Sequence, residues 1–192
     1  MTTSQGEVVS LFLGAPGSLE KTAQAELEFD FDGIVGDRHR GVTRRAWDVT
    51  DKQPGGTERR NERQWSAVAQ EDLDAVTEQL KLAQSLAAGD VAVNLAISGV
   101  QNFSRLPRGT TLTFEGGVVL MVEEYNPPCI RMSKYLAGTL KTSSAAPIAD
   151  DAFIAESKFS RGLVGVVEVS GIVKVGERVI VQPETLPKWL RI

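Results

Sequence analysis

The feature of this sequence that most constrains its fold is a series of short apolar or alternating segments separated by glycine turns. Each segment has the length of a β-strand, and Gly116-Gly117 and Gly171 or Gly176 supply turns of the kind that join strands into hairpins. The pattern predicts a mainly β fold, whose sheet curls into a closed or partly open barrel decorated by a few short helices. In the part of the chain after residue 90, the predicted strands are residues 91–97, 110–114, 118–123, 163–169 and 178–181.

The first third adds two strands and a long connection. Residues 7–13 and 26–31 are predicted as strands, the second because Leu27, Phe29 and Phe31 alternate with polar residues. Residues 33–61 contain several glycines and a proline and show no sustained periodicity. A loop of that length in a compact domain more often has a function than not.

Helices are predicted at four places. A short strand at 65–69 leads into a helix with Glu71 and Asp72 in its first turn and apolar residues at helical spacing. The other predicted helices are a short one ending near Ala88, one at 130–137 and one at 150–157, and residues 138–147 are predicted to form a mobile loop.

The composition predicts a soluble protein of the cytoplasm. A chain of 192 residues with 42% hydrophobic and 24% charged residues is expected to form a single domain over residues 1–192. We find no signal-peptide pattern and no apolar stretch long enough to span a membrane. A single cysteine cannot form an internal disulfide.

Cys129 is the first candidate for chemistry. It follows Pro127-Pro128, which fix the backbone and end the preceding strand, so the thiol is presented at a defined angle. Arg131 lies two residues further on and would favour the thiolate, which is the reactive and metal-binding form. The alternative is that Cys129 is a small buried hydrophobic residue, as free cysteines often are.

An arginine-rich segment is the second candidate. The net charge of −4 argues against general affinity for nucleic acid, yet seven arginines lie between residues 38 and 63 and face only four acidic residues. Guanidinium groups bind phosphate or carboxylate in a bidentate manner, which suggests an anion site. The alternative is a solvated basic loop.

Three further groups of residues could contribute to a site. The run Gly36 to Gly41 places Asp37, Arg38 and the single histidine, His39, between glycines. Asn94 is a polar amide within an apolar segment, which must be satisfied by backbone or by a ligand. Arg161 stands before the glycine-containing segment 163–169, where glycines indicate either a bend or a close approach by another group.

Several classes of site are excluded by composition and spacing. One cysteine and one histidine cannot complete a four-ligand zinc site, and the phosphate-loop and nucleophile-elbow signatures are absent. A nucleophile and base pair formed by Cys129 and His39 stays open, since such partners need not be close in sequence.

Taken in order, these motifs resemble the MOSC domain family, named for the C-terminal part of molybdenum cofactor sulfurases. The resemblance covers residues 30–182 and rests on Gly36 to His39, Arg63-Gln64, Asn94 to Gly99, Pro127-Pro128-Cys129, and Arg161-Gly162-Leu163 to Gly176-Glu177.

The resemblance implies a barrel-like domain that binds the molybdenum cofactor, molybdopterin, or carries sulfur for it, with Cys129 as the catalytic sulfur or metal ligand. Stand-alone relatives reduce N-hydroxylated bases, so the activity would be that of a molybdenum-dependent oxidoreductase or a sulfurtransferase. The residues expected around the cofactor are Asp37, Arg38, His39, Asn94, Arg131 and Arg161.

The sequence departs from the family in ways that affect the expected partners. Ala92-Val93 replaces the usual Gly-Glu before the asparagine, and Glu177 replaces an aspartate. The desulfurase domain of full sulfurases is absent, so pyridoxal phosphate is not expected here. Sulfur would come from a separate cysteine desulfurase or other sulfur donor, or electrons would come from a separate reductase. The substrate would be a small molecule. We expect no membrane partner, and nucleic acid is disfavoured as a partner.

Two other classes of function stay open from the sequence. One is a non-catalytic sulfur carrier in which Cys129 bears a persulfide. The other is an anion-binding or nucleic-acid-binding barrel whose cysteine is structural, which would show salt-sensitive binding to RNA or DNA and no molybdenum uptake.

Overall fold

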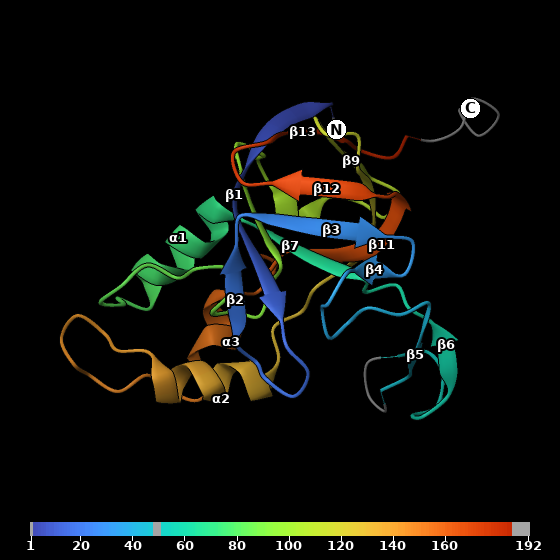
Figure 1. Cartoon of the computed structure of the whole chain (residues 1–192). Helices are drawn as coiled ribbons and strands as arrows, with labels where there is room; N and C mark the ends of the chain where they lie inside the picture. The colour runs from blue at the N-terminus through green and yellow to red at the C-terminus, as the bar shows by residue number, and fades with distance from the viewer. Residues whose placement is uncertain (1, 48–50, 186–192) are drawn as a thin grey trace, which may run out of the picture.

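The structure is a computed structural model that describes residues 2–47 and 51–185, and its centre is a closed β-barrel (Figure 1). Seven strands follow one another around the barrel, and the first and last of this order also pair with each other, which closes it. In spatial order the strands are β13 (Arg178–Gln182), β9 (Thr111–Phe114), β10 (Val119–Tyr125), β11 (Leu163–Val169), β7 (Trp65–Ala69), β8 (Leu95–Ser98) and β1 (Ser4–Gly14). The predicted mainly β barrel fold is confirmed.

Closure joins the two ends of the described chain, because β1 pairs antiparallel with β13 from Ser4 opposite Val181 to Glu7 opposite Arg178. All barrel pairs are antiparallel except β7 and β8, which run parallel. A parallel pair needs a crossover, and helix α1 (Gln70–Gln79) lies in that connection. Its buried Leu73 and Val76 pack inward, and Glu71 and Asp72 occupy the first turn, where acidic groups are favourable.

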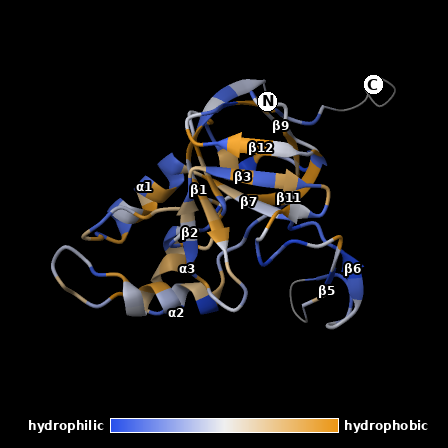
Figure 2. Ribbon diagram, in the orientation of Figure 1, coloured by the Kyte–Doolittle hydropathy of each residue, from blue (hydrophilic) through white to orange (hydrophobic). Residues whose placement is uncertain are grey.

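Smaller elements surround the barrel (Figure 1). Strand β2 (Lys21–Gln24) pairs with the end of β1, while β3 (Glu26–Asp30), β4 (Gly33–Ile34) and β12 (Gly171–Lys174) form a separate three-stranded sheet. A two-stranded hairpin is formed by β5 (Thr43–Arg45) and β6 (Glu58–Arg60), and Figure 2 shows it as largely hydrophilic. The remaining elements are α2 (Ile130–Thr139), α3 (Ala152–Glu156) and the 3₁₀ turn η1 (Phe103–Arg105).

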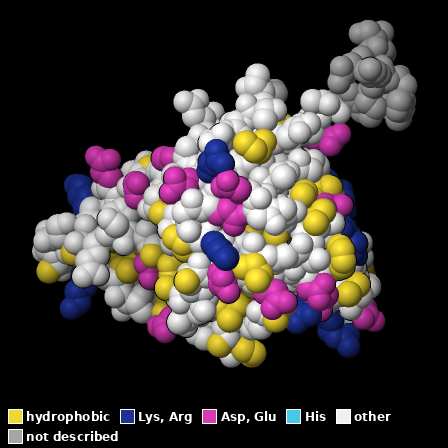
Figure 3. Space-filling view, turned by 45° about the horizontal axis from the view of Figure 1, so that its top comes forward, with side chains coloured by type: hydrophobic (Ala, Val, Ile, Leu, Met, Phe, Trp, Pro, Cys, Tyr) yellow, Lys and Arg dark blue, Asp and Glu magenta, His cyan; other side chains and the backbone are white. Residues whose placement is uncertain are grey.

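Two hydrophobic clusters hold these parts together. The first fills the barrel, where Trp65, Phe103 and Phe114 are almost fully buried. The second lies beneath the helices and includes Met132 and Phe153. On the outside, the face shown in Figure 3 carries acidic and basic side chains interspersed.

Several sequence predictions were wrong in detail. The predicted strand 91–97 begins only at Leu95, because Ala92 adopts a left-handed turn with φ of 58°. The residues before Ala88 form turns and bends, not a helix. The long connection 33–61 contains β4 and the β5–β6 hairpin, and the short strands β2 and β12 were missed. No helix among the described residues is long and apolar enough to cross a membrane.

Candidate functional site

Cys129 is exposed and stands at the junction of a barrel strand and a helix. Strand β10 ends at Tyr125, the diproline follows, and α2 begins immediately after Cys129. The backbone of Cys129 is extended, with φ of −125° and ψ of 155°, and its carbonyl accepts a hydrogen bond of 3.0 Å from the N–H of Ser133. The thiol is thus held at the N-terminal end of a ten-residue helix.

Two adjoining cavities meet at Cys129, and together we call them the cysteine cleft. The large compartment has a volume of about 530 Å³ and the small compartment about 120 Å³. Both are lined by Arg63, Asn126, Cys129 and Arg161, so the cysteine belongs to both.

The two compartments differ in the charge of their walls. The large compartment contains both arginines and carboxylates, and its other lining residues are Arg44, Trp47, Asp51, Glu124, Tyr125 and Pro127. Among the described residues that line the small compartment, three are arginines and none is a carboxylate. Besides the four shared residues, they are Leu19, Arg38, His39, Trp65, Ser66, Ala92, Met132 and Val164.

Arg161 is the most deeply buried cation of the cleft. The residue is only 8% exposed, and one guanidinium nitrogen donates to the carbonyl of Val91 at 2.8 Å. Within the described part of the chain, its buried Nε has no hydrogen-bond partner. Burial lowers the pKa of Arg161 to about 10, while the proximity of Cys129 acts in the opposite direction. A buried donor without a partner is costly, so the described protein leaves part of the hydrogen-bonding capacity of Arg161 unfilled.

Two glycines allow Arg161 to reach this position. Gly162 has φ of 92°, and a Cβ there would collide with the carbonyl of Ala67 on the adjacent strand β7. Within β11, a Cβ on Gly165 would collide with Met121 and with the Trp65 ring. The glycines that the sequence marked as a bend or a close approach are therefore sites of close approach by neighbouring strands.

Asp37 is the centre of a buried network behind the small compartment. Its side chain is fully buried, and its Oδ2 accepts hydrogen bonds from Gly14 N at 2.9 Å, Lys21 Nζ at 3.1 Å and Asn94 Nδ2 at 2.8 Å. Burial alone would raise the pKa of Asp37, but hydrogen bonds from His39 and the charge of Lys21 outweigh it and hold that pKa far below its usual value. Asp37 is therefore an ionised anchor.

His39 connects this network to the cleft. Its backbone N–H donates to Asp37 Oδ1 at 2.9 Å, and its ring Nδ1 lies 3.2 Å from the same oxygen. Because the carboxylate can only accept, Nδ1 carries the proton and Nε2 is left as an acceptor. The ring is 40% exposed and lines the small compartment, and desolvation lowers the pKa of His39 despite the opposing effect of Asp37.

The remaining predicted site residues divide between wall and support. Arg38 lines the small compartment and donates to the carbonyl of Ser18. Asn94 does not line either compartment, because its side chain is used up in bonds to Asp37, Ser66 and Phe12 O. Arg131 is an exposed residue of α2 and is also absent from both walls, although its charge is felt at Arg38.

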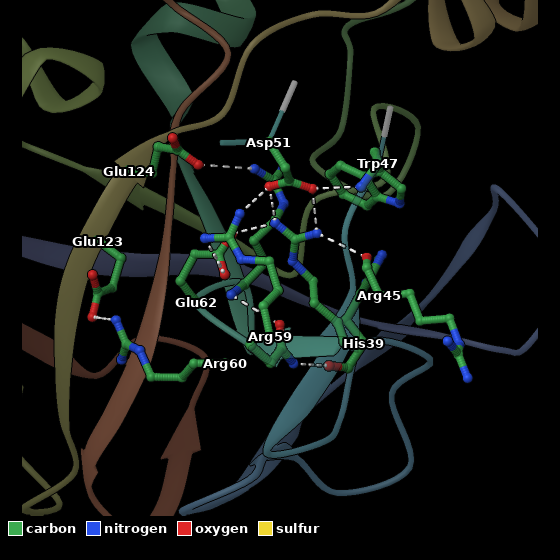
Figure 4. Close-up of polar contacts among 12 residues, drawn as sticks. His39, Arg45, Trp47, Asp51, Arg59, Arg60, Glu62, Glu123 and Glu124 are labelled. Atoms are coloured by element: carbon green, nitrogen blue, oxygen red, sulfur yellow. Dashed lines mark hydrogen bonds and ion pairs between the residues drawn. The ribbon is translucent and has the colours of Figure 1, made fainter. Parts of the chain in front are cut away.

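Much of the arginine-rich segment is neutralised internally (Figure 4). Arg44 makes a two-nitrogen contact with Asp51, at 2.8 and 2.5 Å, and a further one with Glu62. Arg59 also pairs with Asp51, and Arg60 pairs with the buried Glu123 of β10. We call Arg44, Asp51, Arg59 and Glu62 the hairpin cluster.

The structure also reveals site residues that the sequence analysis did not select. Asn126 immediately precedes the diproline and accepts a hydrogen bond of 2.6 Å from Arg63, so its place in the motif was an available signal. Trp47 and Tyr125 line the large compartment, and Trp47 lies under the guanidinium groups of Arg44 and Arg63. Nothing in the local sequence pointed to these aromatic residues.

Comparison with known proteins agrees with this architecture. The model of the MOSC domain matches residues 39–180. A relative from Bacillus subtilis, YuaD, is 29% identical over 169 residues, which are 88% of this chain and 86% of YuaD, and its name connects that protein with metal-sulfur cluster biosynthesis.

Solved structures with a similar fold include one of the same relative. The crystal structure of YuaD from Bacillus subtilis has a TM-score of 0.88 at 26% identity and covers 96% of this chain and 99% of YuaD. YiiM from Geobacillus stearothermophilus has a TM-score of 0.59 at 14% identity, over 92% of this chain and 74% of YiiM.

Proposed function

This chain belongs to the MOSC domain family, and from that premise we propose that its cysteine cleft binds a molybdenum–pterin cofactor through Cys129. The observation that carries the proposal is the exposed thiol of Cys129 at the meeting point of a ligand-sized cavity and a group of arginines.

The donor set is compatible with such a cofactor. Among the described residues, no group of three or more histidine, cysteine or acidic side chains could hold a metal ion. The chain would therefore contribute one sulfur ligand, Cys129, and the other ligands would belong to the cofactor. Thiolate sulfur is a soft ligand that suits a metal bonded to other sulfurs.

The cleft has the size and the walls for the organic part of the cofactor. The large compartment, at about 530 Å³, falls within the roughly 300–1,000 Å³ usual for small-molecule sites. Trp47 and Tyr125 provide apolar walls, and Arg63 and Arg161 could pair with a phosphate. When bound, the cofactor would supply molybdenum redox chemistry, such as the reduction of N-hydroxylated substrates with electrons from a separate reductase.

A second candidate function is sulfur carriage, in which Cys129 bears a persulfide for the cofactor. The observation that favours it is that the one thiol of the chain is exposed, which allows a donor such as a cysteine desulfurase to reach it. The name of the relative YuaD points in the same direction. The same exposure gives no support to a buried structural cysteine.

The decisive test of cofactor binding is Cys129→Ser in protein made in a host that synthesises the cofactor. We expect wild type to contain molybdenum and pterin fluorescence, and Cys129→Ser to lose the molybdenum. Because Cys129 is exposed, the free energy of unfolding of the Cys129→Ser variant should differ from that of wild type by only about 0.5 kcal/mol or less.

A matched control moves the thiol without removing it. Ser85 is exposed and lies outside both compartments, so Cys129→Ser/Ser85→Cys keeps the number of thiols. This double variant should not regain molybdenum. Full molybdenum content in Cys129→Ser would refute the assignment of Cys129 as the ligand.

A further inference from the structure

The small compartment of the cysteine cleft is a cationic space with no internal counter-ion. Arg38, Arg63 and Arg161 line it, and no carboxylate does so among the described residues. Asp37 lies close behind but is occupied by Lys21, His39 and Asn94. Guanidinium groups brought together without a counter-charge form a site for an anion.

Arg161 is the most deeply buried cation of this space. It is only 8% exposed, yet within the described chain its Nε is unpartnered. The guanidinium groups of Arg38 and Arg161 both spend one donor on a backbone carbonyl and keep further donors available.

The volume of the small compartment limits what this anion can be. About 120 Å³ corresponds to roughly four liquid waters, too little for a pterin and enough for a small oxyanion. Because Cys129 lines the same compartment, an anion held there would lie beside the thiol.

We propose that the small compartment binds the oxyanion end of a small sulfane-sulfur donor of the thiosulfate class, and that Cys129 accepts its outer sulfur. The inference rests on the sulfur-carrying function proposed above and names its donor. The thiolate of Cys129 attacks the outer sulfur of thiosulfate, a new sulfur–sulfur bond forms, and the original one breaks. The electron pair of that bond leaves with sulfite, so Cys129 becomes a persulfide and no other oxidant is needed.

In the proposed reaction His39 accepts the thiol proton. Its Nδ1 is committed to Asp37, which leaves Nε2 as the acceptor of a ring that lines the same compartment as Cys129. The arginines would hold the sulfonate oxygens and stabilise sulfite as it leaves.

The test is to mix the purified protein with thiosulfate and to measure sulfite release and the mass of Cys129. We expect one sulfur atom added per chain and an equal amount of sulfite. Cys129→Ser should do neither. Arg161→Gln and Arg38→Gln should each slow the reaction by about tenfold at limiting thiosulfate, since each removes a charged donor. Arg178→Gln, on an arginine paired with Glu115 outside the cleft, should react like wild type.

A second donor separates this inference from the function on which it rests. Inorganic polysulfide delivers sulfur without a sulfonate group, so at saturating polysulfide the final extent of Cys129 loading should be equal in wild type, Arg161→Gln and Arg38→Gln. Loading by polysulfide but not by thiosulfate would overturn the oxyanion site and leave sulfur carriage intact, whereas loading by neither would overturn both.

Two further results complete the test. Added sulfate should slow the thiosulfate reaction competitively in wild type, as expected for a shared site. If Arg161→Gln does not fold, Arg161→Lys and Arg38→Gln carry the comparison, because Arg38 is only half-buried. Wild-type rates with thiosulfate in Arg38→Gln together with Arg161→Lys would overturn the role of the arginines.

Discussion

Two groups of arginines in this protein, those of the hairpin cluster and those of the cysteine cleft, differ in how they are paired. In the hairpin cluster, Arg44 and Arg59 share Asp51 and Glu62, whose side chains are 5% and 8% exposed. In the cysteine cleft, Arg38 and Arg161 donate to backbone carbonyls, and Arg63 donates to the amide of Asn126, with Glu124 more distant at 3.8 Å. The arginines of the hairpin cluster share internal carboxylates, whereas among the described residues no carboxylate lines the small compartment of the cleft.

Under the proposed function, this difference makes the pairing of arginines, and not their density, the feature that should indicate an anion site. The segment from residue 38 to 63 was predicted to bind an anion because it is rich in arginine. In its densest part, the hairpin, Arg44 and Arg59 pair with the carboxylate of Asp51. Arg161, about a hundred residues away, makes its hydrogen bond to the backbone carbonyl of Val91 and not to a carboxylate.

The largest expected effect concerns Asp37, the carboxylate that anchors the cleft. Asp37→Ala leaves Lys21, whose side chain is fully buried, without its charge partner. Breaking a buried pair in this way costs about 3–5 kcal/mol of the free energy of unfolding, measured by urea denaturation at neutral pH. Asp32→Ala removes a partly exposed partner of Arg40 and should cost about 1 kcal/mol or less.

A double variant checks that the loss comes from the unpaired charge. Lys21→Met/Asp37→Leu removes both charges and should be more stable than Asp37→Ala alone. Equal stability of the two variants would mean that the pair is not the cause, and that the cleft is anchored in some other way.

The sequence was sufficient for the barrel because barrel strands follow local rules. Apolar and polar residues alternate in the sequence of β13, and they are alternately buried and exposed in the structure. Gly117 was read from the sequence as a turn residue, and its φ is 94°. The segment 91–97 misled because Val91 and Val93 are buried by tertiary packing while the backbone turns at Ala92. Burial without regular pairing looks like a strand in sequence.

The site was harder to predict from the sequence than the barrel, because its chemistry depends on hydrogen bonds and ion pairs between residues that are distant in the sequence. The diproline placed Cys129 correctly between β10 and α2. The assignment of Asn94 to the wall could not foresee that Ser66, Phe12 and Asp37 would satisfy its amide. Which arginines keep free donors is decided by carboxylates brought near in space.

The pH dependence of stability should also separate the two regions. Burial lowers the pKa of Lys21 from 10.5 to about 8, although Asp37 opposes this effect. Between these values the unfolded chain binds more protons than the folded protein, so stability should rise as the pH increases from 8 to 10.5. The gain is at most about 3 kcal/mol. In the hairpin cluster, the hydrogen bond to Asp51 raises the pKa of Arg44, which stays charged throughout.

Urea denaturation of wild type and Lys21→Met over this pH range isolates the contribution, because the other lysines and tyrosines titrate in both proteins. Lys21→Met should show a smaller increase in unfolding free energy with pH. Parallel curves would mean that Lys21 does not lose its proton in the folded protein and that the charges of the Asp37 network behind the cleft are as fixed as those of the hairpin cluster.

The smallest expected effect comes from a substitution that leaves the arginines of the hairpin cluster with fewer carboxylate partners, as in the small compartment of the cleft. Asp51→Asn keeps the shape of the side chain but removes the charge that Arg44 and Arg59 share, leaving Glu62 as their remaining carboxylate in the cluster. Since Arg44 and Asp51 line the large compartment, sulfate should bind there a few-fold more tightly at low salt, measured by calorimetry. Glu115→Gln makes the same change in net charge beside Arg178, outside the cleft, and should leave sulfate affinity unchanged. If both variants gain affinity equally, overall charge governs anion binding, and the distinction between paired and unpaired arginines fails.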